Sequence, residues 1–465
     1  MSRIVVVGAG FAGLAAGAVL AARGEDVTIL EARPAVGGLA RLATVGGARI
    51  DLGPTILTDL APLRMLAERI GTPLEALAPL ARLDPGFVAT FPGGVRIAAY
   101  ADPARTLTEV RALGPSAEAD WLRLLDLGAR AHRLSEHYYA RGDLTGPRDF
   151  VRFLGGGGIA FGDVWPFARS GALQRLLEAE VRTPRLRQFY GHFARLLGLE
   201  PDRAPAVALV IPHLLARVGI WYPLGGITAL AARLARLAEA RGARLRLEEC
   251  VDGVEIVDGR VRTVRTAAGA FPADVCVSAA GMETTARWMG GGVIARRTAR
   301  LRPADTARVA WWLVEGRPAL PVHHAFHFTG DPAEEPVYVN LPSVTDPDLT
   351  SDGRCIVYAL RHAPIDAPLP EDFADNLRTT VVAAGQWPGG SVLAHDVSAD
   401  PGGCYGYAIG AGILSSRHPS QRVPGVANLI LAGKTVFPGP GVANVIRSGL
   451  RAADLAEAAA GGGGR

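Results

Sequence analysis

Three glycines and one acidic residue near the amino terminus have the spacing of a dinucleotide-binding turn. Gly8, Gly10 and Gly13 follow an apolar run at 4–7, and Glu31 comes directly after a second apolar run. In such a turn the first glycine permits the tight bend, the second lets the backbone approach a pyrophosphate, and the third lets the following helix pack closely. Free N–H groups at the start of that helix bind phosphate, and the acid accepts hydrogen bonds from ribose hydroxyls. The predicted contacts are Gly8, Gly10, Phe11, Ala12, Gly13 and Glu31.

A second glycine-containing loop follows the acid. The first turn alone does not distinguish FAD from NAD. Arg33 stands beside the acid, and the pair Gly37-Gly38 is followed closely by Arg41. Glycines let main-chain N–H groups approach a ligand, and an arginine can clamp phosphate oxygens. A further Gly/Pro turn comes after the next short strand. The predicted contacts in this part are Ala32, Arg33, Gly38, Leu39, Arg41, Gly53, Pro54 and Thr55.

Length and composition place the chain among large folded proteins. It has 465 residues, 49% of them hydrophobic, and a formal net charge of +4. The length allows two or three domains or one discontinuous fold. No uninterrupted apolar run approaches the ~20 residues of a membrane span, and the first strand belongs to the fold, so we expect no cleavable signal. No basic run with interleaved aromatic residues indicates a nucleic-acid partner.

The cysteines carry neither a metal-binding nor a disulfide pattern. Cys250, Cys276, Cys355 and Cys404 are scattered, without a CxxC pair. This usage fits a reducing cytoplasm, and we predict neither a disulfide framework nor a metal site. The mild positive charge suits an anionic membrane surface.

Six stretches with different patterns follow one another along the chain. They are a strand–helix–strand unit at 1–60, a mostly helical region at 61–220, a helix with a small antiparallel meander at 221–285, a sheet-forming region at 286–420, a strand with a Gly/Pro loop and closing helix at 421–460, and a disordered tail at 461–465. The expected elements include a helix at 228–241, meander strands at 245–251, 254–257, 260–266 and 274–278, and sheet strands at 309–314, 323–328, 337–341 and 355–360.

Two apolar segments interrupt the helical region. One spans 150–167 and contains four consecutive glycines among aromatic residues, and the other spans 206–222. Each segment is compatible with a membrane-facing surface, with the lining of a lipid tunnel, or with ordinary core packing. The sequence leaves these three readings open.

Several segments, in the same order along most of the chain, resemble the phytoene (carotenoid) desaturase family of the amine-oxidase-like flavoprotein superfamily. They are Asp51–Thr55, Thr183–Arg187, Trp221–Gly226, His323–His324 with Phe326 and Phe328, Tyr338–Pro347, and Phe437–Val442. The resemblance implies an α/β fold in which a discontinuous Rossmann-type FAD-binding domain carries an inserted α+β substrate domain. It also implies FAD as the cofactor and dehydrogenation of a long apolar polyene at a membrane surface.

The resemblance also assigns contacts that the first two loops do not. It implies that the strand near Val251 meets adenine through its backbone, and that the loop 439–443 lies against the flavin. The implied residues of that closing part are Gly433, Gly441, Val442 and Ala443. The sequence departs from the family in three places, which are Leu39 where Arg or Lys is usual, Lys434 after Gly433, and a shortened connection at 328–337.

The family chemistry is removal of a hydride from a C–H beside a double bond, with loss of a proton from the neighbouring carbon. The flavin supplies the redox chemistry, and the protein supplies orientation and an apolar tunnel. The catalytic residues stay unassigned, because one sequence does not select a base among the histidines. The candidates by type are His192, His213, His323, His324 and His327, of which His324 and His327 point to opposite faces of a strand.

Other readings of the same features stay open. A flavin-dependent polyene isomerase or saturase would carry the same motifs. An amine oxidase on this fold would be expected to hold a lysine in its substrate domain, whereas Lys434 is the only lysine. A lipid-binding escort protein without redox chemistry is a further alternative.

No second glycine fingerprint for NAD(P)H stands out, so oxygen or a membrane quinone is the expected electron acceptor. We expect a cytoplasmic protein, peripheral on the inner face of the membrane.

Overall fold

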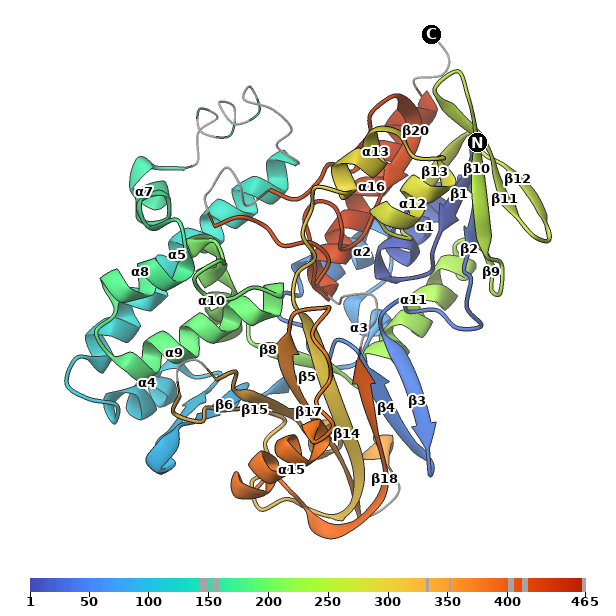
Figure 1. Cartoon of the computed structure of the whole chain (residues 1–465). Helices are drawn as coiled ribbons and strands as arrows, with labels where there is room; N and C mark the ends of the chain where they lie inside the picture. The colour runs from blue at the N-terminus through green and yellow to red at the C-terminus, as the bar shows by residue number, and fades with distance from the viewer. Residues whose placement is uncertain are drawn as a thin grey trace.

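The computed structural model is a mixed α/β fold with two large sheets and a helical region beside them (Figure 1). It describes residues 1–142, 149, 153, 155, 159–331, 334–350, 353–399, 405–411 and 417–461. Of the apolar segment 150–167, residues 150–152, 154 and 156–158 therefore lie outside the described residues, as do 462–465 of the expected tail. Gly461 is still the last residue of helix α16, so the tail does not begin there as expected.

The first sheet has six strands, contributed by three separate parts of the chain. Its order is β19-β20-β13-β1-β2-β9, and every neighbouring pair is parallel except β19 with β20. The strands are β1 (Arg3–Val7), β2 (Asp26–Leu30), β9 (Arg244–Arg246), β13 (Val275–Ser278), β19 (Arg422–Val423) and β20 (Val426–Leu431). The central strands are buried nearly throughout, as expected where helices cover both faces of a parallel sheet.

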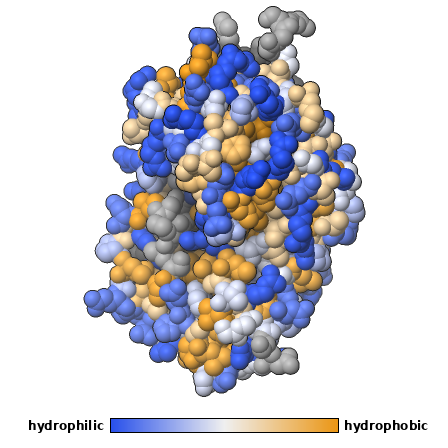
Figure 2. All heavy atoms as spheres, turned by 90° about the vertical axis from the view of Figure 1, so that its right-hand side faces the viewer, coloured by the Kyte–Doolittle hydropathy of each residue, from blue (hydrophilic) through white to orange (hydrophobic). Residues whose placement is uncertain are grey.

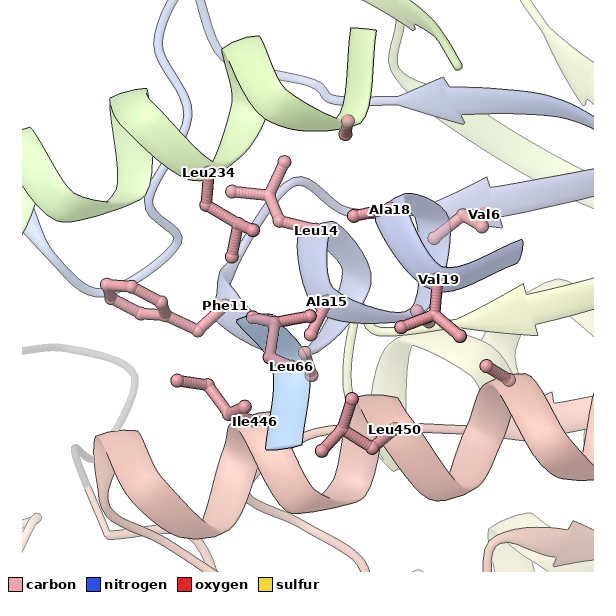
Figure 3. Packing of buried hydrophobic residues seen from close by; sticks show 14 of the residues in the cluster. Val6, Phe11, Leu14, Ala15, Ala18, Val19, Leu66, Leu234, Ile446 and Leu450 are labelled. Carbon is pink, nitrogen blue, oxygen red and sulfur yellow. The ribbon is translucent and has the colours of Figure 1, made fainter. Parts of the chain in front are cut away.

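Helix α1 (Phe11–Ala22) forms the centre of this first layer. Its residues from Phe11 to Ala21 are all buried, because the helix is apolar around its whole circumference. Figure 3 shows it between two further helices, with Leu14 facing Leu234 and Ala15 and Val19 facing Ile446 and Leu450. The surrounding helices are α2 (Ala61–Arg69), α3 (Leu74–Leu77), α11 (Ile227–Ala240) and α16 (Val442–Gly461). The helix expected at 228–241 is thus confirmed as α11.

The expected four-stranded meander is wrong at both of its ends. Only β10 (Val251–Val257), β11 (Arg260–Thr266) and β12 (Gly269–Pro272) form the antiparallel unit. The first and last expected strands instead become β9 and β13 of the parallel sheet. Short apolar strands read alike in both settings, because local periodicity does not specify the pairing partner. A separate hairpin is formed by β3 (Arg41–Val45) and β4 (Ala48–Leu52).

The second sheet has seven strands in the order β18-β14-β17-β16-β15-β6-β7. Its strands are β6 (Phe87–Thr90), β7 (Arg96–Ala99), β14 (Thr306–Gly316), β15 (His324–His327), β16 (Val337–Asn340), β17 (Arg354–Ala363) and β18 (Gly389–Ala399). The four strands expected between 309 and 360 are confirmed. β6 and β7 come from the stretch expected to be mostly helical, and β18 was not anticipated. Helix α15 (Phe373–Ala383) packs on one face of the sheet.

Helices from the middle of the chain lie beside the second sheet, at the left of Figure 1. They are α4 (Pro103–Arg111), α5 (Ala117–Arg141), α7 (Phe161–Ser170), α8 (Leu173–Glu180), α9 (Pro184–His192) and α10 (Val210–Arg217), with 3-10 turns at Phe193–Leu197 and Ala206–Leu209. The remaining elements are 3-10 turns at Pro92–Gly94 and Pro347–Leu349, the strand pair β5 (Leu80–Leu83) and β8 (Ile220–Pro223), and helices α12 (Met282–Trp288), α13 (Gly292–Thr298) and α14 (Pro342–Thr345).

The outer surface is mixed in character. The face shown in Figure 2 carries hydrophilic and hydrophobic residues in small interspersed groups. Among the residues that the structure describes, none of the helices combines the length and the apolar character needed to cross a membrane.

Candidate active site

One large cavity joins the two sheets and the helical region. Its volume is about 1130 Å³, beyond the roughly 300–1,000 Å³ of pockets that hold one small ligand. One end is bordered by the loops that follow β1, β2, β13 and β20. These loops meet because the carboxyl ends of parallel strands lie at one edge of a sheet, which is where such folds bind ligands. The other end is bordered by the helical region and by the second sheet.

The turn between β1 and α1 has the shape that the glycine spacing predicts. The N–H of Gly8 donates to the carbonyl of Leu30 at 2.7 Å, which fixes the turn against β2. A Cβ at position 13 would lie 1.9 Å from the carbonyl oxygen of Gly8, so only glycine fits there. Gly10 caps α1 without a side chain of its own. The first N–H groups of α1 therefore face the cavity without a competing side-chain acceptor from the capping residue.

The Glu31 carboxylate is held in place at the edge of the cavity. One oxygen accepts from the N–H of Ala9 at 2.7 Å and the other from the N–H of Arg33 at 3.1 Å. The guanidinium of Arg33 in turn donates to the carbonyl of Gly38. These contacts fix the acid, the first loop and the second loop relative to one another. A carboxylate with two oxygens has acceptor positions beyond these two bonds, so it can still accept from a ribose hydroxyl.

The structure brings the predicted contacts together from distant parts of the chain. All of them line the cavity except Gly13, which is buried beneath it. The lining members are Gly8, Gly10, Phe11, Ala12, Glu31, Ala32, Arg33, Gly38, Leu39, Arg41, Gly53, Pro54, Thr55, Val251, Gly433, Gly441, Val442 and Ala443. Gly13 serves packing, as its Cβ clash shows. The cradle between the first two loops is narrow, because a Cβ on Gly38 would lie 3.0 Å from the Cα of Gly10.

A buried hydroxyl that the sequence did not reveal holds the closing loop before α16. The Ser448 hydroxyl accepts from the N–H of Gly433 at 3.0 Å and donates to the carbonyl of Phe437 at 2.9 Å. Gly433 and Gly441 have φ of 106° and 95°, values that favour glycine. Lys434 also lines the cavity, although the sequence offered it only as a departure from the family. The glycines of this closing loop therefore face the cavity with main-chain atoms alone.

The far part of the cavity is mainly apolar. Its walls combine side chains from α5, α7, the 206–222 segment and the second sheet, including Leu134, Phe167, Val207, Ile211, Leu214, Val309, Phe326 and Leu360. The 206–222 segment contributes both to the wall of this cavity and to the core. Val207, Val210 and Ile211 line the cavity, whereas Leu209 and Leu215 lie in the core.

None of the five histidines considered as a base lines the cavity. All five are buried, and burial lowers the pKa of His192 and His323 to about 3 and that of His213 to about 4. Burial also lowers the pKa of His324 and His327. They are therefore neutral near pH 7. The cavity is instead lined by His132, His362 and His418, which no local pattern singled out.

One buried histidine nevertheless reaches the cavity through a neighbour. The Tyr338 hydroxyl lies 2.6 Å from Nδ1 of His324 and 3.3 Å from the Thr55 hydroxyl. Tyr338 lines the cavity, and Thr55 belongs to the predicted Gly/Pro turn. Because His324 is neutral, its Nδ1 can accept the Tyr338 hydrogen. The second sheet and the predicted cofactor loop are thus joined at this point.

Comparison with known proteins identifies the family. A model of the flavin containing amine oxidoreductases matches residues 11–456. The chain is 30% identical to a hydroxyneurosporene desaturase of Rubrivivax gelatinosus, over 97% of this chain and 92% of that protein. It is 28% identical to a phytoene dehydrogenase of Streptomyces griseus, over 98% and 95% of the two chains. Its fold is similar to that of an oxidoreductase from Methanosarcina mazei, with a TM-score of 0.69, 18% identity, and 97% and 100% of the two chains covered. The chain therefore belongs to the flavin containing amine oxidoreductase family and, within it, to the carotenoid desaturases, and it is an FAD-dependent oxidoreductase.

Proposed function

We propose that the protein desaturates a long, linear, apolar polyene of the carotenoid class. The observation that supports this most directly is one continuous cavity, which is lined by the dinucleotide loops and by an apolar wall from the helical region and the second sheet. The relatives named for desaturation of hydroxyneurosporene and dehydrogenation of phytoene act on molecules of this kind. A deep apolar cavity suits a substrate with few polar groups, because burying it removes apolar surface from water.

The cofactor placement follows from the loops around the six-stranded sheet. We propose that the stretches 1–60, 221–285 and 421–460 form one discontinuous Rossmann-type domain and that 61–220 and 286–420 form the substrate domain. In this placement Glu31 and Val251 hold the adenosine, the loops at 8–12 and 32–41 hold the pyrophosphate, and Gly53–Thr55, Gly433 and Gly441–Ala443 lie beside the flavin. When bound, FAD supplies the hydride acceptor.

The residues of this chain then bind, orient and desolvate the polyene. The apolar wall fixes the chain and excludes water from the reacting carbon atoms. Burial raises the pKa of Tyr338 and lowers that of His324, so both groups are uncharged near pH 7 and the Tyr338 hydroxyl can donate to Nδ1 of His324. Tyr338 and His324 thus add no charge to the cavity wall beside Thr55, which suits an uncharged substrate.

We also propose that helix α7 attaches the protein to the cytoplasmic surface of a membrane. An apolar polyene dissolves in the hydrocarbon of that membrane. The side chains of Phe161 and Trp165 are stacked with ring centroids 5.4 Å apart, and 76% and 51% of their surfaces are exposed. Exposed aromatic residues favour the interface between lipid and water.

We expect the double variant Phe161→Ser/Trp165→Ser to lose sedimentation with anionic vesicles. Leu393→Ser, which removes an exposed apolar side chain on β18, is the control. Equal sedimentation of all three proteins would reject this attachment.

The function is tested by co-expression in a host that accumulates phytoene or a later acyclic carotenoid. Chromatography with absorbance detection should show a product with a longer conjugated system and red-shifted absorption. Assays of the purified protein with oxygen or with a quinone as acceptor then identify the oxidant. A product with unchanged conjugation but altered cis/trans ratio, or with a shortened polyene, would replace the desaturase proposal with an isomerase or a saturase.

A further inference from the structure

Desaturation needs a proton acceptor at the cavity, and the five buried histidines do not line it. A C–H bond breaks on each of two neighbouring carbon atoms. One hydrogen leaves as a hydride, which FAD accepts, and the other leaves as a proton while its electron pair becomes the new double bond. A hydrocarbon polyene has no basic group of its own. A side chain that reaches the cavity is therefore the natural acceptor for the proton.

Five carboxyl side chains line the cavity, and their contacts distinguish them. They are Glu31, Asp59, Glu136, Glu249 and Glu283. Glu31 and Glu249 lie at the end where we place the adenosine, and the N–H of Glu249 donates to the carbonyl of Glu31 at 2.8 Å. Glu283 accepts a hydrogen bond from the Tyr407 hydroxyl. Asp59 and Glu136 remain, and both are bound to helix α16.

One arginine of α16 holds both carboxylates. Arg447 forms ion pairs with Asp59 and Glu136, each at 3.0 Å, and its guanidinium lies 4.4 Å from the ring centroid of Tyr139. Tyr139 also lines the cavity, and burial raises its pKa, so it adds no charge near pH 7. The cluster thus contains one guanidinium and two carboxylates. Uptake of one proton would balance its charge.

The cluster borders both the residues that we place beside the flavin and the apolar wall. Arg447 comes four residues after Ala443 on α16, and residues four apart lie on the same side of a helix. Glu136 lines the cavity from α5, as does Leu134 of the apolar wall. A polyene that extends from this wall to the flavin would therefore pass Glu136.

Glu136 has an oxygen available for the proton, whereas Asp59 does not. Oδ2 of Asp59 accepts from Arg447, and Oδ1 accepts from the N–H of Ala61 at 2.8 Å. Within the part of the chain that the structure describes, Glu136 is bound only through Oε1, which leaves Oε2 without a hydrogen-bond donor. The Glu136 side chain is 46% exposed, so a proton that it has accepted can pass on to water.

We propose that Glu136 is the catalytic residue that accepts the proton lost from the polyene, and that Arg447 is a positioning residue that holds its carboxylate at the cavity wall. This inference rests on the proposed function. The C–H bond beside the carbon that loses the hydride breaks, its electron pair forms the new double bond, and its proton passes to Oε2 of Glu136. The carboxylic acid then releases the proton to water, which restores the carboxylate.

The test follows anaerobic reduction of the FAD-loaded protein by the loss of flavin absorbance, with phytoene and, separately, neurosporene in detergent micelles. We expect Glu136→Gln to slow reduction by about 100-fold or more, because general base catalysis contributes a factor of roughly 10²–10⁴. FAD content, the dissociation constant of the polyene and the melting temperature should stay unchanged. Glu118→Gln is the matched control, because Glu118 is also on α5 and paired with an arginine, at 2.8 Å, but does not line the cavity.

Two further variants separate a chemical role from a structural one. Added formate should restore part of the rate in Glu136→Ala, because it can occupy the space of the missing carboxylate. Arg447→Met should slow reduction by itself but cause no further loss in Glu136→Gln, because Arg447 acts through Glu136.

An unchanged rate in Glu136→Gln would overturn the inference. Slowing that formate does not relieve and that adds to the effect of Arg447→Met would indicate a structural role and would overturn it as well. Both results require that the unchanged protein is reduced by a polyene. If neither polyene reduces it and no product with lengthened conjugation forms, the proposed function fails, and this inference fails with it.

Discussion

Two alanine substitutions three residues apart should separate folding from cofactor binding. In Gly13→Ala the new Cβ would lie 1.9 Å from the carbonyl oxygen of Gly8. The helix would have to move by at least 1.1 Å to reach the shortest contact that real Cβ atoms show, 3.0 Å. Helix α1 has no room for this movement, because Phe11–Ala21 are buried against the sheet, α11 and α16.

The expected cost follows from this overlap. Overpacking of a well-packed core destabilises by about 1–3 kcal/mol and sometimes more. For unfolding of the whole 465-residue chain, at about 2.1 cal/mol/K per residue, this destabilisation corresponds to a fall in melting temperature of roughly 1–3 °C. We therefore expect Gly13→Ala to lower the melting temperature of the apoprotein and to reduce its soluble yield.

Gly10→Ala should have the opposite profile. Gly10 has φ of −77°, which any residue adopts, and its Cβ would lie 3.5 Å from the Cα of Gly38, an ordinary contact. We expect the apoprotein to melt at the same temperature as the unchanged protein. The added methyl group would stand in the cradle where we place the pyrophosphate, so we expect FAD to bind at least tenfold more weakly, or about 1.4 kcal/mol.

The assay combines thermal melting of the apoproteins with FAD titration followed by flavin fluorescence. Unchanged FAD affinity in Gly10→Ala would refute the placement of the pyrophosphate between the first two loops. An unchanged melting temperature in Gly13→Ala would refute the reasoning about helix packing. Because the two variants differ only in position, general effects of adding a methyl group cancel.

Two further predictions concern charge. Glu31→Gln should weaken FAD binding by roughly 10- to 150-fold, because a hydrogen bond to a charged group contributes about 1.5–3 kcal/mol; titration of the apoprotein measures it, and equal affinity would argue against a ribose contact. Acidification from pH 7 to 5 should lower the melting temperature. Burial holds the pKa of His323 near 3 in the folded state, whereas the pKa of a histidine in the unfolded chain is about 6.5. Below pH 6.5 the unfolded chain therefore binds more protons than the folded one. Each such histidine lowers the free energy of unfolding by roughly 2 kcal/mol at pH 5. His323→Asn should flatten this dependence, and a melting temperature constant over the range would contradict it.

The parts of the fold that local sequence specifies were predictable. The apolar strand before Gly8, the spacing of the three glycines and Glu31 describe one β-α-β unit whose contacts are close in sequence. The helix α11 was predictable because its apolar residues recur at helical spacing. The pairing of strands was not, and for this reason β9 and β13 were assigned to the meander rather than to the parallel sheet. β6 and β7, each four residues long, were read as part of a helical region.

The functional site divides in the same way. The sequence by itself determined the dinucleotide loops, because a tight turn and a close approach of backbone require glycine at fixed spacings. The tertiary structure alone decided which side chains line the cavity. It buried the five candidate histidines away from the cavity, and it brought His362 and Tyr405 together through the packing of distant segments. A hydrogen bond between residues far apart in the chain leaves no local pattern, since its geometry is set by how the sheet and its neighbouring loops pack.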